Sequence, residues 1–311
     1  MIDFPTGRAA GGAHAGERAV QERAHEGGPE WGSPMFGPEI PLGFVPFLRA
    51  QHMLIAGAAD DDGAVWSTVL TGRPGFIQPA DERTIVVDAL PAPGDPLHGA
   101  FRTYRDVGLL ALHPQTRRRI RVNGVARQDG QRLIVRTEQV LGNCPKYLQT
   151  RTITGSDDAT PAGAPAAGTA LTDGQRRWIE TADTFFIASR SPEHGADSSH
   201  RGGTPGFVTV TGPRTLRWPD YTGNQFYMTL GNLHLDPASG LLFLDWEHGH
   251  TLQLTGAARI DWAPESAAAY PGALRVVEFD VASVVQRDHA SPLRWQLQEY
   301  SRVNPPVAGR S

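Results

Sequence analysis

The chain has 311 residues, of which 40% are hydrophobic and 20% charged, and its formal net charge at pH 7 is −4. This length suits two domains, and the slight acidity gives no reason to expect nucleic acid or a membrane surface as a partner. No apolar run reaches the roughly 18 residues of a membrane span, and the first residues do not show a secretory signal pattern. A single cysteine, Cys144, excludes an internal disulfide and predicts a cytoplasmic protein.

Two halves of the sequence resemble each other. Ile55-Ala56 recurs as Ile187-Ala188, and Pro74-Gly75-Phe76 recurs as Pro205-Gly206-Phe207, each about 132 residues later. Gly108-Leu109-Leu110 returns as Gly240-Leu241-Leu242 at the same spacing. A repeat of this length exceeds the roughly 20–50 residues of a solenoid unit, so it indicates a duplicated domain.

The first half contains mostly short strands. Helices are predicted at Ala15–His25 and Leu42–Gln51, and strands at His52–Ala58, Val65–Thr71, Thr84–Ala89, Val107–Leu112, Arg119–Arg127 and Leu133–Val140. Residues 155–168 are rich in Ala, Gly, Pro and Asp without periodicity, which predicts a flexible linker.

The second half repeats this order. Thr172 is the expected N-cap of a helix reaching about Ala182, and Met228–Leu235 is a short helix that ends at Asp236-Pro237. Strands are predicted at Phe185–Ser189, Phe207–Val210, Leu216–Trp218, Leu241–Asp245, Thr251–Arg259 and Arg275–Val281. Six antiparallel strands with one buried face tend to close, so the pattern predicts a mainly β protein built from two tandem β-barrels.

The halves differ where chemistry could lie. The first half reads Ser67-Thr68-Val69-Leu70-Thr71, whereas the second reads Ser198-Ser199-His200-Arg201-Gly202. Hydroxyl groups, a guanidinium and exposed backbone N–H groups beside glycine are the donors that a phosphate requires. The alternative is a polar strand end that precedes a glycine turn.

Further polar segments are weaker candidates. Thr229 and Asn232 share a face near the start of a short helix, where phosphate can bind, although they could equally satisfy their own backbone. Gln253 alternates with leucines and faces either solvent or a ligand. The arginines of residues 117–121 could bind an anion or form a solvated face, and Lys146 and Tyr147 offer a second cation and a planar cover.

Metal or nucleophilic chemistry is not expected. Glu247-His248-Gly249-His250 contains metal-ligand types, but it falls in a predicted turn and no complete ligand set has recognisable spacing. Cys144 has no His–Asp pair nearby in sequence, which favours a small buried hydrophobe over a nucleophile.

These motifs resemble those of predicted flavin-nucleotide-binding proteins, which are related to pyridoxamine 5′-phosphate oxidase and have the FMN-binding split-barrel fold. The resemblance covers about residues 40–300. It rests on Ser199-His200-Arg201-Gly202-Gly203, Trp218-Pro219-Asp220-Tyr221, Gly223-Asn224, Thr229-Leu230-Gly231-Asn232-Leu233, Leu252-Gln253-Leu254-Thr255-Gly256 and Gly142-Asn143-Cys144-Pro145-Lys146-Tyr147.

The resemblance implies two split barrels that hold FMN at their contact. The implied cofactor-binding residues are Ser199, His200, Arg201, Gly202, Asn224, Thr229, Asn232 and Gln253 in the second barrel, with Lys146 and Tyr147 from the first. The first copy lacks the arginine, because Leu70 or Val69 stands in its place, and it is therefore expected to supply only a wall. The oxidase's pyridoxamine-phosphate-binding residues have no counterparts here.

The resulting division is an N-terminal arm (residues 1–40), a first barrel (41–154), a linker (155–171) and a second barrel (172–311). We expect an FMN-dependent oxidoreductase acting on a small molecule, with a homodimer as the expected assembly. The alternatives are a flavin carrier or sensor without turnover, or a split barrel that binds haem or a deazaflavin. A haem protein would require an axial ligand, for which His200 is the candidate. Catalytic residues are not assignable from the sequence.

Overall fold

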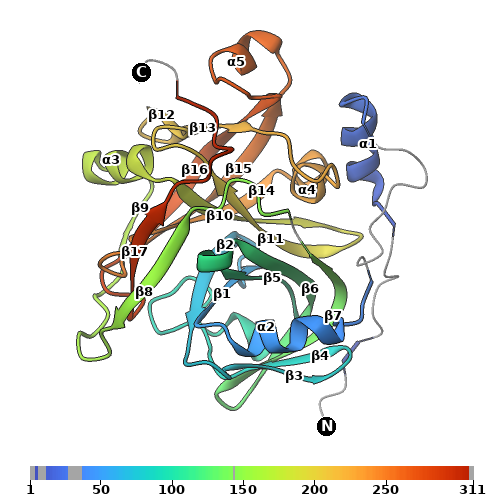
Figure 1. Cartoon of the computed structure of the whole chain (residues 1–311), viewed down its shortest axis with the longest axis vertical. Coiled ribbons are helices and arrows are strands. Elements are labelled where there is room, and N and C mark those ends of the chain that lie inside the picture. The colour runs from blue at the N-terminus through green and yellow to red at the C-terminus, as the bar shows by residue number, and fades with distance from the viewer. Residues whose placement is uncertain (1–3, 6–11, 27–36, 143, 308–311) are drawn as a thin grey trace.

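The computed structural model describes residues 4–5, 12–26, 37–142 and 144–307. Most of its elements are strands, and most of the strands belong to two large sheets that lie one above the other (Figure 1). Much of the predicted N-terminal arm, together with Asn143, lies outside the described residues.

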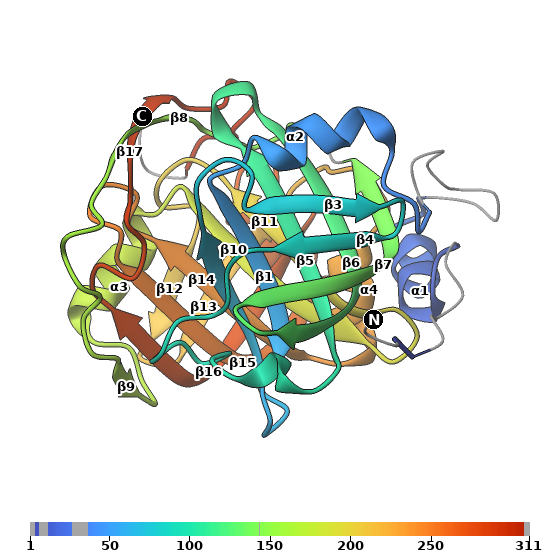
Figure 2. The ribbon, with the colours of Figure 1, turned by 90° about the horizontal axis from the view of Figure 1, so that it is seen from below.

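The first sheet is seven-stranded, in the order β2-β1-β5-β6-β7-β4-β3. Its strands are β1 (Met53–Ala59), β2 (Val65–Thr71), β3 (Ile77–Asp81), β4 (Thr84–Val87), β5 (Arg105–His113), β6 (Arg118–Asp129) and β7 (Arg132–Gly142). A short helix, α2 (Val45–Arg49), covers one side of this sheet near β3 (Figure 2). The 3-10 turns η1 (Leu42–Phe44), η2 (Ala100–Arg102) and η3 (Pro114–Thr116) connect its parts.

The second sheet repeats this order as β11-β10-β14-β15-β16-β13-β12. Its strands are β10 (Thr184–Ser191), β11 (Gly195–Gly202), β12 (Thr209–Gly212), β13 (Thr215–Asp220), β14 (Ala238–Leu244), β15 (Thr251–Asp261) and β16 (Arg275–Arg287). The helices of this half are α3 (Asp173–Thr181), α4 (Met228–Leu235) and α5 (Pro264–Ala268). The shared order confirms the prediction of two tandem barrels of the split type.

Each sheet encloses its own apolar core, and a third cluster joins the two sheets. The joining cluster includes Ile55 and Leu110 from the first sheet and Phe186 and Leu242 from the second. Gly108 on β5 packs against the backbone of Asp197 on β11 so closely that an added Cβ would lie 2.3 Å from its carbonyl carbon. The repeat position of Gly108, Gly240, packs in the same manner against Val65 and Trp66 on β2. Such reciprocal contacts are those of a twofold dimer, here formed within one chain.

The structure corrects the register of the repeat by one residue. Ile55 pairs with Leu110, while Phe186 pairs with Leu242, so Ile55 corresponds to Phe186 and not to Ile187. The position of the side chains supports this register. Ile55 and Phe186 both belong to the cluster between the sheets, whereas Ile187 lies in the core of its own barrel. A shift of one residue turns every side chain of a strand to the other face.

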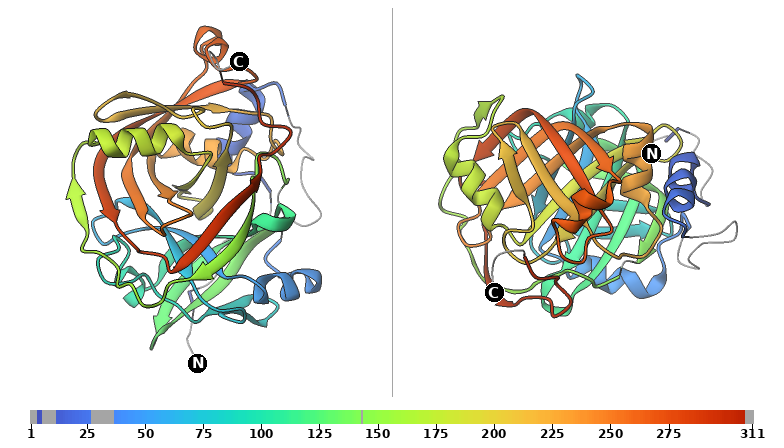
Figure 3. Two further views of the ribbon diagram at one scale, coloured as in Figure 1. Left: turned by 60° about the vertical axis from the view of Figure 1, so that its left-hand side comes forward. Right: turned by 90° about the horizontal axis from the view of Figure 1, so that it is seen from above.

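Three strands were not expected: one that overlaps the start of the predicted linker, one inside it and one near the end of the chain. The strand β8 (Thr150–Ser156) pairs with β17 (Leu293–Glu299), and β9 (Ala166–Gly168) pairs with β16. Figure 3 shows β17 and β8 running side by side along the outside of the two sheets. Residues 155–156 and 166–168, at the two ends of the predicted flexible linker, thus belong to strands, because distant segments of the chain pair with them.

The predicted start of α3 and the predicted bounds of α4 are confirmed. Thr172 caps α3, since its Oγ1 accepts the backbone N–H of Gln175 at 3.3 Å. The helix α4 spans Met228–Leu235 and ends before Asp236. The predicted N-terminal helix is α1 (Ala15–Arg23), which packs against α4 (Figure 1).

Candidate functional site

A pocket of about 120 Å³ lies where β6 of the first sheet faces β11, the loop after β13 and α4 of the second. It brings together most of the residues that the sequence indicated. The lining includes Lys146, Tyr147, Ser199, His200, Arg201, Gly202, Asn224 and Thr229. Two arginines of β6, Arg119 and Arg121, line it as well.

The arginines converge on one hydroxyl group. Arg121 donates from Nη2 to Ser199 Oγ at 2.7 Å, and Arg201 donates from Nη1 to the same oxygen at 2.9 Å. Alternation along β6 turns Arg119 and Arg121 toward the second barrel, while Ile120 enters the first barrel's core. Two guanidinium groups from different barrels thus meet at Ser199.

The rest of the arginine run lies elsewhere. Arg117 donates to Glu299 at 3.1 Å, and Arg118 lies over the ring of Phe47 at 5.1 Å. Only alternate members of the run therefore reach the pocket.

Several buried nitrogen atoms around the pocket have no hydrogen-bond partner. They are Arg119 Nε, Arg121 Nε, Arg201 Nε and His200 Nε2. Burying a donor without an acceptor costs about 1–3 kcal/mol, so the three guanidinium N–H groups at one place need a reason. An anion with several oxygens provides one.

Burial and neighbouring positive charges lower the pKa values of Arg119, Arg201 and His200. Burial, followed by the charge of Arg121, lowers the pKa of Arg119 to about 9. Burial also lowers the pKa of Arg201, against the opposing effect of Asp220. Burial and the neighbouring Arg119 hold the pKa of His200 well below its usual range, so His200 is neutral at physiological pH. The cationic side chains that line the pocket are therefore Arg119, Arg121, Arg201 and Lys146, and His200 adds no charge.

Asp197 forms an ion pair with Arg121. Its Oδ1 lies 3.2 Å from Arg121 Nη1 and accepts a hydrogen bond from Asn123 at 3.2 Å. Thr229 donates its hydroxyl to Asp197 Oδ2 at 3.3 Å. Thr229 therefore lines the pocket while its hydroxyl supports the carboxylate that orients Arg121.

Two loops form the rim. The rings of Tyr147 and Tyr221 are 5.1 Å apart, and Tyr147 Oη donates to the carbonyl of Thr222 at 3.1 Å. Asn224 uses Oδ1 to accept the N–H of Phe226 at 3.3 Å, which shapes the second loop. The two tyrosines place flat aromatic surface beside the cationic end.

Two residues that the sequence indicated lie away from this pocket. Asn232 lies under α1, where its Oδ1 accepts a hydrogen bond from His14 Nε2 at 2.9 Å and its Nδ2 donates to Ser189 Oγ at 3.0 Å. Gln253 lies on β15 and donates to the carbonyl oxygen of Ser67 at 3.0 Å and to Asp95 at 3.2 Å.

Gln253 belongs to the counterpart of the pocket in the other half of the pseudo-dimer. Gln253 pairs with Leu242 as Arg121 pairs with Leu110, so the two occupy equivalent positions. By the same pairing, Thr68 is equivalent to Ser199.

At the counterpart position, the hydrogen-bond donors are occupied by the carboxylate of Asp95. Thr68 and Gln253 both donate to the carboxylate of Asp95, which also accepts the N–H of Leu97 at 2.8 Å. In the pocket, the residue equivalent to Gln253, Arg121, is paired instead with Asp197 of β11, and Asp220 lines the wall beside Arg201. One of the two equivalent positions is thus filled by a carboxylate of its own loop, whereas the other lines a pocket.

The pairing also identifies the residue equivalent to Arg201. Leu54 pairs with Leu70, and Phe185 pairs with Arg201, so Leu70 stands where Arg201 stands, and Val69 does not. Leu70 is buried in the first barrel's core.

The sequence 247–250 lies, as predicted, in the turn between β14 and β15. His248 Nδ1 is 3.0 Å from Asp245 Oδ2, and the rings of His248 and His250 stack at 5.6 Å. His248 is largely exposed.

A scan of protein-family models finds no match, and a search of curated proteins finds none either. Solved structures similar to part of the chain include Group A Streptococcus HupZ, with 11% identity and a TM-score of 0.31 over 37% of this chain and 98% of that one. An FMN-binding protein from Syntrophomonas wolfei has 8% identity and a TM-score of 0.28, with 36% and 84% covered. An FAD binding protein from Mycobacterium smegmatis has 13% identity and a TM-score of 0.28, with 39% and 98% covered.

Among the described residues, the helices are all too short or too polar to cross a membrane.

Proposed function

We propose that the pocket between the barrels binds the phosphate of FMN and that the protein is an FMN-dependent oxidoreductase acting on a small molecule. The observation that carries the proposal is the meeting of Arg121 and Arg201 at the Ser199 hydroxyl, with unpartnered guanidinium nitrogens around it. The motif resemblance in Ser199-His200-Arg201-Gly202 supports the choice of a flavin nucleotide over other phosphates.

The residues present fit the phosphate end of this cofactor. Forked guanidinium groups and a hydroxyl match phosphate oxygens in geometry and charge. At about 120 Å³ the pocket is smaller than the roughly 300–1,000 Å³ typical of whole-ligand sites, so it suits the phosphate end rather than the entire cofactor. Tyr147 and Tyr221 supply aromatic surface at the rim for a planar group.

When bound, FMN would supply the hydride or electron transfer itself. The chain's part is to bind and orient. Arg121, Arg201 and Ser199 would hold the dianion, Asp197 would keep Arg121 in place, and the tyrosines of the rim would limit access of water. A carrier or sensor would need the same residues, so turnover has to be measured separately.

The binding test is a titration of FMN-free full-length protein with FMN, followed by flavin fluorescence. Arg201→Ala should weaken FMN binding roughly tenfold or more, because a charge-assisted hydrogen bond contributes about 1.5–3 kcal/mol. Arg121→Ala should do the same. Arg132→Ala, which removes an exposed arginine paired with Asp88, is the charge-matched control and should leave the affinity unchanged.

Gln253→Ala separates this pocket from its counterpart. Gln253 contacts Ser67 and Asp95, so its loss should leave FMN affinity within about twofold of the wild-type value. Equal weakening by Gln253→Ala and Arg201→Ala would contradict the placement of the phosphate.

An absorbance spectrum of purified protein distinguishes the cofactor classes. Two flavin bands support the proposal, whereas a single Soret band would identify haem. A colourless protein that takes up no added FMN would overturn flavin binding. Bleaching of bound FMN by NADH or NADPH, followed by reoxidation in air, would distinguish an oxidoreductase from a carrier.

A further inference from the structure

The N-terminal helix α1 packs closely on α4, the helix whose first residues line the pocket. Gly16 of α1 lies so near to Gly231 of α4 that an added Cβ would be 2.2 Å from the Gly231 carbonyl oxygen. One turn further along α1, Val20 is 1% exposed and belongs to the core of the second barrel. The backbones of the two helices are therefore in direct contact.

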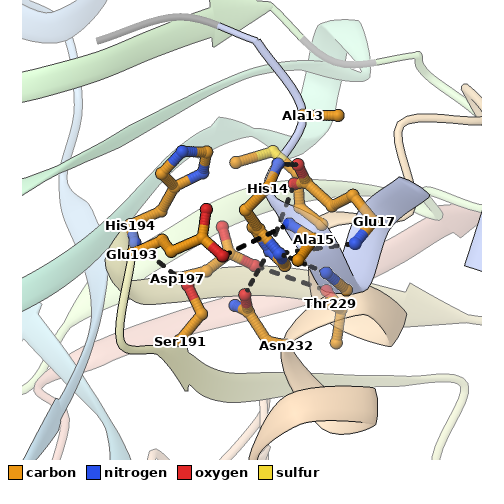
Figure 4. A network of polar contacts seen from close by, with 12 residues as sticks. Ala13, His14, Ala15, Glu17, Ser191, Glu193, His194, Asp197, Thr229 and Asn232 are labelled. Carbon is orange, nitrogen blue, oxygen red and sulfur yellow. Dashed lines mark hydrogen bonds and ion pairs between the residues drawn. The ribbon is translucent and has the colours of Figure 1, made fainter. Parts of the chain in front are cut away.

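The cap of α1 adds a polar contact to α4 (Figure 4). His14 Nδ1 accepts the N–H of Gly16 at 3.1 Å, and His14 Nε2 donates to Asn232 Oδ1 at 2.9 Å. Glu17 Oε2 accepts the N–H of His14 at 2.8 Å and completes the capping box. Because Asn232 belongs to α4, the cap joins the first turn of α1 to that helix.

The other end of α1 contacts the segment that leads into α4. Gln21 is 6% exposed and donates from Nε2 to the carbonyl oxygen of Gln225 at 3.2 Å. Glu26, just after the helix, accepts a hydrogen bond from the hydroxyl group of Tyr227. Gln225 and Tyr227 both line the pocket. The contacts of α1 thus reach the wall of the pocket.

This segment has an unfavourable backbone conformation. The φ angle is 62° at Gln225 and 58° at Tyr227, in the left-handed region that favours glycine. Residues with a side chain keep such angles where surrounding contacts impose them. Tyr227 has one such contact from Arg275, whose Nη2 donates to its hydroxyl group at 3.3 Å. The hydrogen bonds from α1 restrain both left-handed residues.

We propose that α1 positions the wall of the pocket at residues 225–229, with Gln21 and Glu26 as its positioning residues. They act through Gln225 and Tyr227, since neither is among the described residues that line the pocket. The expected effect on FMN rests on the proposed function. A wall that is already ordered raises affinity, because the apparent dissociation constant is the intrinsic one divided by the fraction of molecules in the competent form.

Hydrogen–deuterium exchange of FMN-free, full-length protein tests the positioning without the cofactor. Gln21→Glu replaces the donor by a carboxylate, which the Gln225 carbonyl repels, and it should speed exchange across residues 225–235. Gly16→Ala should do the same, because the new methyl group separates α1 from α4 while alanine favours the helix itself.

Two controls belong to the exchange measurement. Glu22→Gln removes an exposed charge of α1 and should leave the exchange of residues 225–235 unchanged. The strand β17 lies outside the two sheets, and its exchange should match the wild-type rate in every variant, which shows that the fold is intact.

FMN titration of the same proteins measures the consequence for binding. Gln21→Glu and Glu26→Ala should each weaken FMN binding roughly fivefold, as for a wall that is competent about a fifth of the time. Glu26→Gln keeps an acceptor for the Tyr227 hydroxyl group and should restore most of the affinity. This rescue distinguishes positioning from a general loss of structure.

The two measurements separate this inference from the proposed function. A wild-type protein that takes up no FMN would overturn the proposed function, whereas exchange alone would still decide whether α1 orders the wall. Unchanged exchange in both Gln21→Glu and Gly16→Ala would overturn the positioning role. In a protein that binds FMN, equal affinity of the Gln21→Glu and Glu22→Gln variants would overturn it as well.

Discussion

Arg201 and Leu70 occupy equivalent positions in the two barrels, but Arg201 lines the pocket whereas Leu70 packs in an apolar core. Leu70 completes an apolar core, whereas Arg201 brings a charge to a place that burial makes unfavourable, as its lowered pKa indicates. Such a residue weakens the free protein and becomes favourable when an anion binds. Functional sites commonly reduce stability in this way.

We therefore expect Arg201→Leu to separate stability from binding. Arg201 is partly buried and crowded by Arg121, and replacing such a charge by an apolar side chain is often neutral or stabilising, so the FMN-free variant should gain about 1 kcal/mol in its free energy of unfolding. Its FMN affinity should fall roughly tenfold or more. Urea denaturation and FMN titration of the same preparation measure both effects. A variant that is less stable and still binds FMN normally would contradict this account.

The sequence identified some of these residues and could not identify others. Ser199 and Arg201 stand out because the repeat offers an apolar counterpart for comparison. Asp197 supports Arg121 from another barrel, and no spacing in the sequence reveals such a contact. Gln253 was assigned to the pocket by its motif, yet the duplication places it at the counterpart position.

At the scale of elements, close packing of β5 on β11 sets the distance between the barrels. Gly108 allows this approach because a side chain there would collide with the backbone of Asp197. The contact lies two residues from Ser199 on the same strand, so the spacing of the barrels and the shape of the pocket are linked.

Gly108→Ala should therefore destabilise the protein by about 2–3 kcal/mol, the cost of overpacking a buried contact. Gly212→Ala on β12 is the control, since an added Cβ there meets no atom within 4 Å and its stability should change by less than about 0.5 kcal/mol. Urea denaturation compares the two. Similar stabilities for both variants would show that the barrels can separate without cost.

Element prediction succeeded where the pattern is local. The cap at Thr172 and the limits of α4 follow from neighbouring residues, as does the alternation of β6. The pairing of β8 with β17 joins segments about 140 residues apart. Apolar and polar residues alternate along β17, but β8 has no such alternation, so the sequence does not reveal the pair.

For the whole molecule, duplication created two equivalent positions at the contact between the barrels. The first of these positions, the pocket, contains an arginine from each barrel, Arg121 and Arg201. The other has Gln253 and Leu70 in their places and is filled by Asp95. Because burial raises the pKa of Asp95, that carboxylate is held at a cost, which its donors from Thr68 and Gln253 offset.

The protein should consequently bind one FMN per chain. A carboxylate from the chain already accepts the hydrogen bonds at the counterpart position, and no arginine replaces Leu70 there, so a phosphate would meet both repulsion and too few donors. Equilibrium dialysis with the protein concentration known from amino-acid analysis gives the ratio directly. Asp95→Asn removes the repulsion but adds no cation, and it should keep the ratio at one. A ratio of two in either protein would show that the barrels remain equivalent in binding.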